Sequence, residues 1–272
     1  MAIAEREADY LGMLNPAQRE AAAFGSRKDG GSFVAGPMLV IAGAGTGKTM
    51  TLAHRVAHLV IEGTHPERIL LLTFTRRAAE EMTRRVENIV RATMRDAVPL
   101  PAGGLPWSGT FHSVANRLLR HFAGNLGLDP GFSVLDRGDA ADMLDVVRHE
   151  RRLSRTSRRF PKKDTCLAIY SRCVNAQKTL DETLEQFYPW CSDWSDELAD
   201  LFRHYVERKQ HCQSLDYDDL LLYWNHLVAD AEFAREIGSW FDHVLVDEYQ
   251  DTNLVQAQIL HALKPDGRGV TV

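Results

Sequence analysis

The chain has 272 residues, a length that favours about two domains. Hydrophobic residues make up 44% of it and charged residues 25%, which is the composition of a globular protein. No apolar run approaches the roughly 18 residues that cross a membrane, and the acidic N-terminus lacks a signal core, so we expect a cytoplasmic protein rather than a membrane or secreted one. The net charge of −5 does not by itself indicate a nucleic-acid-binding protein.

The first motif is the stretch 14–21, Leu-Asn-Pro-Ala-Gln-Arg-Glu-Ala. Asn15 can cap a helix that has Pro16 at its first position, and Gln18 then stands at the third position of a capping box. The Gln18 amide can also pair with an adenine edge, because it offers a donor and an acceptor together. Both interpretations are open at this point. The stretch 24–37 is rich in glycine and serine and is expected to be a loop.

The stretch 38–51 carries the main motif of the chain. An apolar, β-favouring run at 38–41 leads into three glycines, and a helical pattern begins at Lys48. This order fits the phosphate-binding loop G-x-x-x-x-G-K-[ST], with Ala42 in place of the first glycine. The alternative is an ordinary glycine-rich turn, which would not need a strand before it and Lys-Thr and a helix after it. Lys48 can reach the β- and γ-phosphates of ATP, and the Thr49 hydroxyl can ligate Mg²⁺. The expected ATP-binding residues of this loop are Ala42, Gly43, Ala44, Gly45, Thr46, Gly47, Lys48 and Thr49.

Strands and helices alternate after this loop. The stretches 51–61 and 76–93 have helical patterns, and the run 69–74 between them is an apolar strand. A third strand is expected at 107–111, followed by a helix that starts near His112. Because an all-apolar strand followed by a helix is typical of a parallel sheet covered on both faces, we expect an α/β fold.

The pattern changes at residue 116 and stays different to about residue 212. Helical patterns dominate and strand signals are nearly absent, so we expect an all-helical insertion. Within it, the basic segment 148–163 holds eight arginines and lysines against the single acid Glu150. Such a run is either a solvated surface segment or a patch that contacts phosphates, and the sequence leaves both open. The helices are expected at 112–125, 139–151, 164–179 and 193–210.

A second chemical centre lies at 243–253, where an apolar strand ends in Asp247 and Glu248. Open α/β sheets place ligands at the carboxyl ends of their strands. Asp247 can hold Mg²⁺, and Glu248 can orient or deprotonate the attacking water, so Glu248, Lys48 and Asp247 are the expected catalytic residues. Asp247 follows Lys48 by 247 − 48 = 199 residues, which is too long for one helical crossover and supports an inserted domain.

Together these residues resemble the superfamily 1 DNA helicases of the UvrD/Rep/PcrA type. The resemblance covers nearly the whole chain in the family's order, and Val-Asp-Glu-Tyr-Gln-Asp-Thr-Asn at 246–253 is an especially specific part of it. It implies a P-loop NTPase fold, in which a RecA-like parallel sheet is flanked by helices and interrupted by a helical subdomain. The implied domains are 1A at 1–115, the inserted 1B at 116–212 and the second part of 1A at 213–272. The matching stretches are 14–21, 42–49, 73–82, 109–113, 216–220 and 244–253.

The resemblance also implies roles for single residues. Gln18 would read the adenine, and Gln250 would belong to the same ATP site. Phe74 would stack on bases, although its place at the end of an apolar strand also allows core packing. Met50 departs from the family, which usually has arginine there. The expected DNA-contacting residues are Thr73, Phe74, Arg77, Thr110 and His112.

The function implied by the resemblance is ATP-driven 3′→5′ translocation on single-stranded DNA and unwinding of 3′-tailed duplexes, with ATP and Mg²⁺ as cofactors. The family's second motor domain would follow Val272, so we expect a fragment that binds ATP and single-stranded DNA but is nearly inactive alone. Two alternatives are open: the helicase part of a helicase–nuclease of the AddA/RecB type, and a nucleotide- and DNA-binding polypeptide without motor activity.

Overall fold

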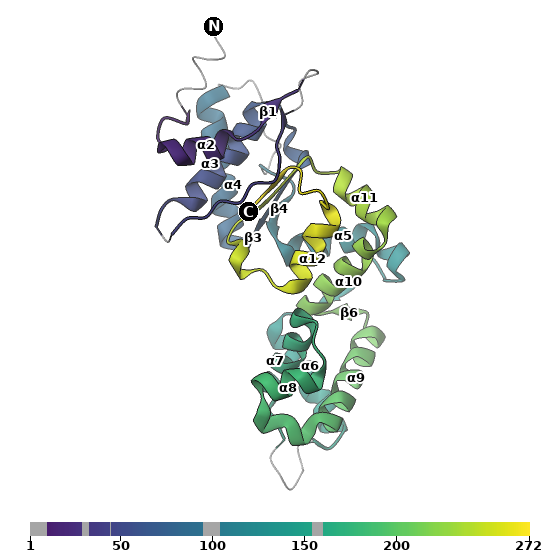
Figure 1. Cartoon of the computed structure of the whole chain (residues 1–272). Coiled ribbons are helices and arrows are strands. Elements are labelled where there is room, and N and C mark those ends of the chain that lie inside the picture. The colour runs from purple at the N-terminus through teal and green to yellow at the C-terminus, as the bar shows by residue number, and fades with distance from the viewer. Residues whose placement is uncertain (1–9, 29–32, 44, 95–103, 154–159) are drawn as a thin grey trace. The chain divides into compact units, whose positions relative to one another are not determined.

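The computed structural model describes residues 10–28, 33–43, 45–94, 104–153 and 160–272 (Figure 1). The chain forms two compact units: unit 1 is Met1–Val114, Val228–Thr252 and Leu260–Val272, and unit 2 is Ala115–Leu227 and Asn253–Ile259. Within the described part of the chain, every helix is too short or too polar to cross a membrane. The helices that run from one unit into the other are α5 (Phe111–His121), α10 (Tyr217–Ala229) and α12 (Leu254–Leu263).

A four-stranded parallel sheet forms the centre of unit 1. Leu72 lies opposite Gly109 on one side and opposite Val246 on the other, and the strand order is β4-β3-β7-β8. β3 and β7 are buried at every residue, as expected of apolar strands in a covered parallel sheet. The sheet and its flanking helices confirm the predicted α/β fold. The strands are β3 (Ile69–Thr73), β4 (Ser108–Thr110), β7 (His243–Val246) and β8 (Val270–Thr271).

The apolar run at 38–41 is less regular than its sequence predicts. The Met38 amide donates to the Val270 carbonyl at 2.9 Å and the Val40 amide to the Val272 carbonyl at 2.7 Å, so the run lies alongside β8. Only Met38 forms a β-bridge, and Ile41 is 88% exposed. The run therefore extends the sheet as an edge with one neighbour, because within the described residues no strand pairs with its other side.

The helix that follows the phosphate-binding loop and the next helix of unit 1 pack on this sheet. α3 (Lys48–Ile61) and α4 (Arg76–Met94) bury Val56, Leu59 and Met82 in one cluster with β3. Both helices match their predicted positions closely. The stretch expected as a loop instead contains a short antiparallel pair, β1 (Ser26–Arg27) and β2 (Phe33–Val34). Among the described residues, the other α-helices that lie wholly in this unit are α2 (Pro16–Ala23) and α11 (Ala231–Ser239).

Unit 2 is mainly helical, as predicted, with a core of its own around Leu144, Ile169 and Leu198. The helix expected at 164–179 ends at Ala176, because Gln177 adopts a left-handed conformation with φ 52°. Thr179 then caps a further helix, which was not predicted, through a capping box. A two-residue parallel pair, β5 (Ser133–Val134) and β6 (Ser214–Leu215), is the exception to the all-helical prediction. The helices are α6 (Arg137–Glu150), α7 (Lys163–Ala176), α8 (Leu180–Phe187) and α9 (Ser195–His211).

A buried ion cluster joins α9 to the start of α10 in unit 2. Lys209 is only 2% exposed, and its Nζ lies 2.6 Å from carboxylate oxygens of both Asp216 and Asp219. The Tyr205 hydroxyl donates to Asp216 at 2.8 Å. Burial and the neighbouring Asp216 raise the pKa of Asp219 to about 6. Asp216 and Asp219, which lie in the family-matching stretch 216–220, therefore neutralise a buried cation that would otherwise be strongly destabilising.

Candidate functional site

The glycine-rich loop turns through two left-handed glycines before α3 begins. Gly45 and Gly47 have φ angles of 76° and 86°, in the left-handed region that glycine adopts without strain. Gly47 is the N-cap of α3 and offers no side-chain cap, so the first amides of the helix are left to an external acceptor. The Thr46 hydroxyl donates to the Gly43 carbonyl at 2.7 Å and holds the turn. Ala44 lies outside the described residues.

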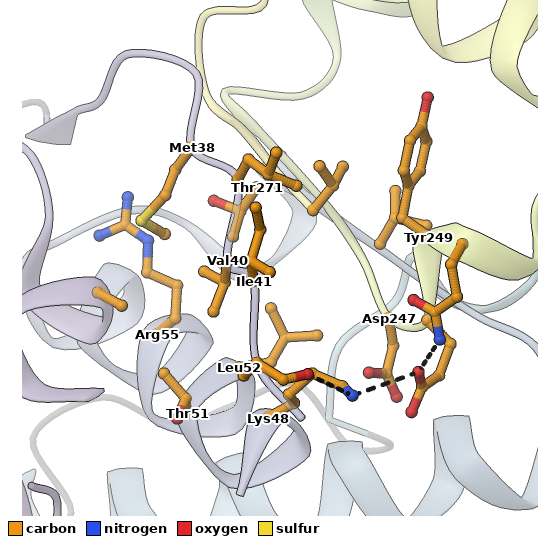
Figure 2. Close-up of a pocket in the computed structure, with 17 residues that line it drawn as sticks. Met38, Val40, Ile41, Lys48, Thr51, Leu52, Arg55, Asp247, Tyr249 and Thr271 are labelled. Carbon is orange, nitrogen blue, oxygen red and sulfur yellow. Dashed lines mark hydrogen bonds and ion pairs between the residues drawn. The ribbon is translucent and has the colours of Figure 1, made fainter. Parts of the chain in front are cut away.

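Lys48 and Glu248, which are 248 − 48 = 200 residues apart, meet at one edge of the sheet. The Lys48 ammonium donates to the Ala42 carbonyl at 3.1 Å and lies 4.0 Å from a Glu248 carboxylate oxygen (Figure 2). Both side chains are half-buried, and Gln250 donates to the same carboxylate oxygen of Glu248. The cation and the carboxylate are thus close without forming a tight ion pair, which leaves each able to interact with a ligand.

Asp247 is placed beside them by the end of β7. Its amide donates to the Leu72 carbonyl at 2.9 Å, which fixes its backbone to β3. Burial and then the neighbouring Glu248 raise the pKa of the Asp247 carboxyl, so a cation beside it would be stabilising. Among the described residues no three His, Cys, Asp or Glu side chains gather as a metal site. The predicted ligands, the Asp247 carboxylate and the Thr49 hydroxyl, are oxygen donors of the kind that Mg²⁺ prefers, and this ion usually keeps several waters and binds substrate phosphates.

A cavity of about 320 Å³ lies beside these residues in unit 1. Figure 2 shows Lys48 and Asp247 toward one end of it and Met38 and Arg55 toward the other. Its walls between these ends are mainly apolar, with Leu52 as one example. Lys48 and the carboxylates therefore lie at the end where the phosphate-binding loop meets the carboxyl end of β7, whereas Arg55 lies at the opposite end.

Gln18 forms the predicted capping box, whereas its contact with adenine stays a prediction. Its Oε1 accepts from the Asn15 amide at 3.0 Å, and its own amide donates to the Asn15 side chain, so the capping box is present. Its Nε2 also donates to the Thr46 carbonyl at 2.8 Å, which ties α2 to the phosphate-binding loop. A Cβ atom at Gly47 would lie only 2.9 Å from Gln18 Nε2. The Gln18 side chain is therefore held at the phosphate-binding loop.

Comparison with known proteins agrees with this geometry. A model of the UvrD/REP helicase N-terminal domain matches residues 14–272. The chain belongs to this family. The ATP-dependent DNA helicase PcrA of Bacillus subtilis (strain 168) is 34% identical over 259 residues, which are 93% of this chain and 31% of PcrA. PcrA of Leuconostoc citreum is 31% identical over 241 residues, 87% of this chain and 30% of that protein. The chain thus spans about a third of the length of these relatives.

In this UvrD/REP chain, the residues expected at DNA gather at the same sheet edge as Asp247. Thr73 and Thr110 are directly opposite each other at the ends of β3 and β4. Phe74 is 66% exposed, so the core-packing interpretation of this side chain is wrong. Arg77 is exposed on the first turn of α4. His112 is half-buried, and burial lowers its pKa, so this histidine is neutral at pH 7.

The basic segment 148–163 is less available than its sequence suggests. Arg148 pairs with Asp145 at 2.8 Å, Arg151 pairs with Asp200 at 2.5 Å, and Lys163 pairs with Asp142. Three cations of the segment are therefore neutralised within the chain, which favours the surface-segment interpretation for them. The cations of this segment that lie outside the described residues are Arg155, Arg158 and Arg159.

No motif of this family's sequence pattern marked Arg55, although the structure places it in the cavity wall. Arg55 is 1% exposed, and burial lowers its pKa to about 10. One guanidinium nitrogen donates to the Ala22 carbonyl at 3.2 Å, and the group lies 5.7 Å from the Phe33 ring centroid. The other two guanidinium nitrogens have no hydrogen-bond partner in the described part of the chain. The sequence indicated only that Arg55 lies one helical turn after Thr51, which does not predict a position in the cavity wall.

Proposed function

We propose that this chain is the ATP-binding part of an ATP-dependent DNA helicase that translocates 3′→5′ on single-stranded DNA. The observation that carries the proposal is the approach of Lys48 to Glu248 beside the phosphate-binding loop. In this proposal, 1–115 and 213–272 form domain 1A, and 116–212 form the inserted domain 1B. The division of the chain into two compact units supports such an organisation.

The nucleotide site follows from the chemistry of its side chains. Bound Mg²⁺ and ATP supply the phosphoanhydride bond and a cation that draws charge from it. Lys48 and the amides at the start of α3 bind the phosphate oxygens, and Asp247 with Thr49 holds the metal. Glu248 orients the attacking water and accepts its proton. Gln18 and Gln250 contact the nucleotide, and the loop from Ala42 to Thr49 surrounds its phosphates.

The DNA site lies at the carboxyl ends of β3 and β4. Phe74 offers an exposed ring on which bases of any sequence can stack. Arg77 contacts a phosphate, and Thr73, Thr110 and His112 line the same path. The proposed substrate is single-stranded DNA or a duplex with a 3′ tail, and the second motor domain of the longer protein is the proposed partner.

The test is a titration of the chain with a fluorescent ATP analogue and Mg²⁺. Lys48→Ala should lose most of the affinity, because the loop loses its point charge against the phosphates. Lys28→Ala is the matched control, since Lys28 is exposed in unit 1 and does not line the cavity. Equal affinity in the wild-type chain and in Lys48→Ala would defeat the assignment.

Hydrolysis by this chain alone should be slow. An arginine that reaches the γ-phosphate is worth on the order of 10³–10⁵ in rate. Among the described residues that line the cavity, the cations are Lys48 and Arg55, and Arg55 is fully buried. Steady-state ATPase, measured with and without an oligonucleotide, should stay close to background. Turnover near the roughly 10 s⁻¹ median of enzymes would contradict this expectation.

A further inference from the structure

A second cavity, of about 610 Å³, lies within unit 2. It is formed by the start of α6, the last turns of α7, the residue after α8 and the start of α12. Its size falls in the range of about 300–1,000 Å³ that is usual for ligand sites. Most of the residues that line this cavity are polar, unlike those of the cavity of unit 1. The polar lining residues are Arg137, Ser171, Arg172, Asn175, Tyr188 and Asn253.

The amides and the hydroxyl of this cavity are held in place by one hydrogen-bonded chain. Asn253 donates to the Asn175 side-chain oxygen at 2.5 Å, and Asn175 donates to Asp218 at 2.7 Å. The Ser171 hydroxyl donates to the same Asp218 oxygen at 3.0 Å. Because Asp218 is buried and accepts both bonds, its carboxylate is turned away from a ligand. The polar wall is thus fixed before any ligand arrives.

Two arginines give the cavity its charge. Arg137 and Arg172 are both exposed, and neither forms an ion pair among the described residues. The Arg172 guanidinium lies 4.2 Å from the Phe187 ring centroid, which orients it without neutralising it. Arg148 and Arg151 of the basic segment differ, because each pairs with an aspartate. Arg137 and Arg172 therefore keep their charge for an external anion.

We propose that this cavity binds the phosphodiester backbone of single-stranded DNA, with Arg137 and Arg172 as the phosphate ligands. The proposal rests on the DNA-dependent function proposed above and adds a second contact region in unit 2. Tyr188 supplies an aromatic surface next to the cations, which is the combination that single-strand sites use. Asn253 is the last residue of the stretch 243–253, which also contains Asp247 and Glu248. DNA bound in the cavity would therefore contact the end of this stretch.

The test is the salt dependence of binding to a labelled oligothymidylate, measured by fluorescence anisotropy. Each phosphate contact on a single strand contributes about 0.7 to the slope of log affinity against log salt concentration. The double variant Arg137→Gln/Arg172→Gln should therefore flatten the slope by about 1.4. The matched control is Arg203→Gln, because Arg203 is exposed in the same unit, outside the cavity, and pairs with Asp200. The control should keep the wild-type slope.

Three outcomes would overturn the inference. An unchanged slope and affinity in the double variant would do so, as would an equal loss in Arg203→Gln, which would indicate non-specific surface charge. If the double variant unfolds at a lower temperature than wild type, the single variant Arg137→Gln replaces it, since Arg137 is exposed at the first position of α6. An unchanged slope and affinity in that single variant would then overturn the inference. The proposed function fails separately: a wild-type chain that binds no oligonucleotide overturns both proposals, whereas normal wild-type binding with an unchanged slope in the variants overturns only this one.

Discussion

Each unit of the molecule holds one lysine beside two carboxylates, and the two clusters differ in every other respect. In unit 1, Lys48 lies 4.0 Å from Glu248, and both side chains are half-exposed beside a cavity. In unit 2, Lys209 lies 2.6 Å from two aspartates, and it is 2% exposed. We call the first the open cluster and the second the closed cluster.

The difference between the clusters teaches how distance and burial separate a ligand site from a structural ion pair. In the closed cluster the two carboxylates together outweigh the desolvation of Lys209 and raise its pKa, so its charge is retained in the core. In the open cluster the lysine makes one hydrogen bond within the described part of the chain, to the Ala42 carbonyl at 3.1 Å. The other N–H groups of Lys48 are available to donate to phosphate oxygens, whereas the Lys209 ammonium is paired with Asp216 and Asp219 inside the protein.

The largest expected effect is on folding, at the closed cluster. Lys209→Met removes the cation and leaves two aspartates buried together, which should cost about 3–5 kcal/mol of unfolding free energy. Lys48→Met should change the same quantity by about 0.5 kcal/mol or less, because its environment is half-exposed. Urea denaturation followed by circular dichroism measures both. Similar losses in the two variants would remove the distinction between the clusters.

The next effect is on catalysis, at the open cluster. In a longer chain that includes the proposed second motor domain, Glu248→Gln should keep the affinity for Mg²⁺ and ATP but slow hydrolysis at least about a hundredfold, the usual scale for a lost general base. Single-turnover hydrolysis, with the protein in excess over ATP, makes even slow rates measurable. Glu236→Gln is the control, since Glu236 is an exposed glutamate of the same unit outside the cavity. An unchanged rate in Glu248→Gln would assign the water to another residue.

The smallest effect is a pH dependence that belongs to the closed cluster. The folded chain raises the pKa of Asp219 from its ordinary 3.8 to about 6, so folding favours the protonated form. The stabilisation is complete below about pH 4 and is lost as the pH rises through about 6. Asp219→Asn removes this titration, so its unfolding free energy should fall less than that of wild type between these values. Parallel curves for the two proteins across that range would show that Asp219 does not titrate there.

The parts of the open cluster that the sequence predicted are local patterns. Each of these patterns is contained in a few consecutive residues. They are the apolar run that forms β3, the glycines of the phosphate-binding loop and the acids after β7. The closed cluster could not be predicted in the same way, because the burial of Lys209 depends on which helices pack around it. The burial of Arg55 could not be predicted for the same reason, since an arginine in a helix is usually exposed.

The irregular run at 38–41 shows a further limit of local patterns. Its apolar side chains predict a buried strand, but among the described residues this run pairs only with β8 and so lies at the edge of the sheet. Leu39 and Ile41 are consequently exposed despite their sequence. Conversely, the exposure of Phe74 follows from its position just past the end of β3, where the sheet no longer covers it.

The most direct test of the two-cluster account is the thermal unfolding of three proteins with and without a saturating, non-hydrolysable ATP analogue and Mg²⁺. A ligand at a hundred times its dissociation constant stabilises the folded state by about 2.7 kcal/mol. Wild type and Lys209→Met should both unfold at a higher temperature when the analogue is present, although Lys209→Met starts from a lower one. Lys48→Ala should start near wild type and gain nothing from the analogue. A full ligand-induced shift in Lys48→Ala, or its loss in a folded Lys209→Met, would contradict the account.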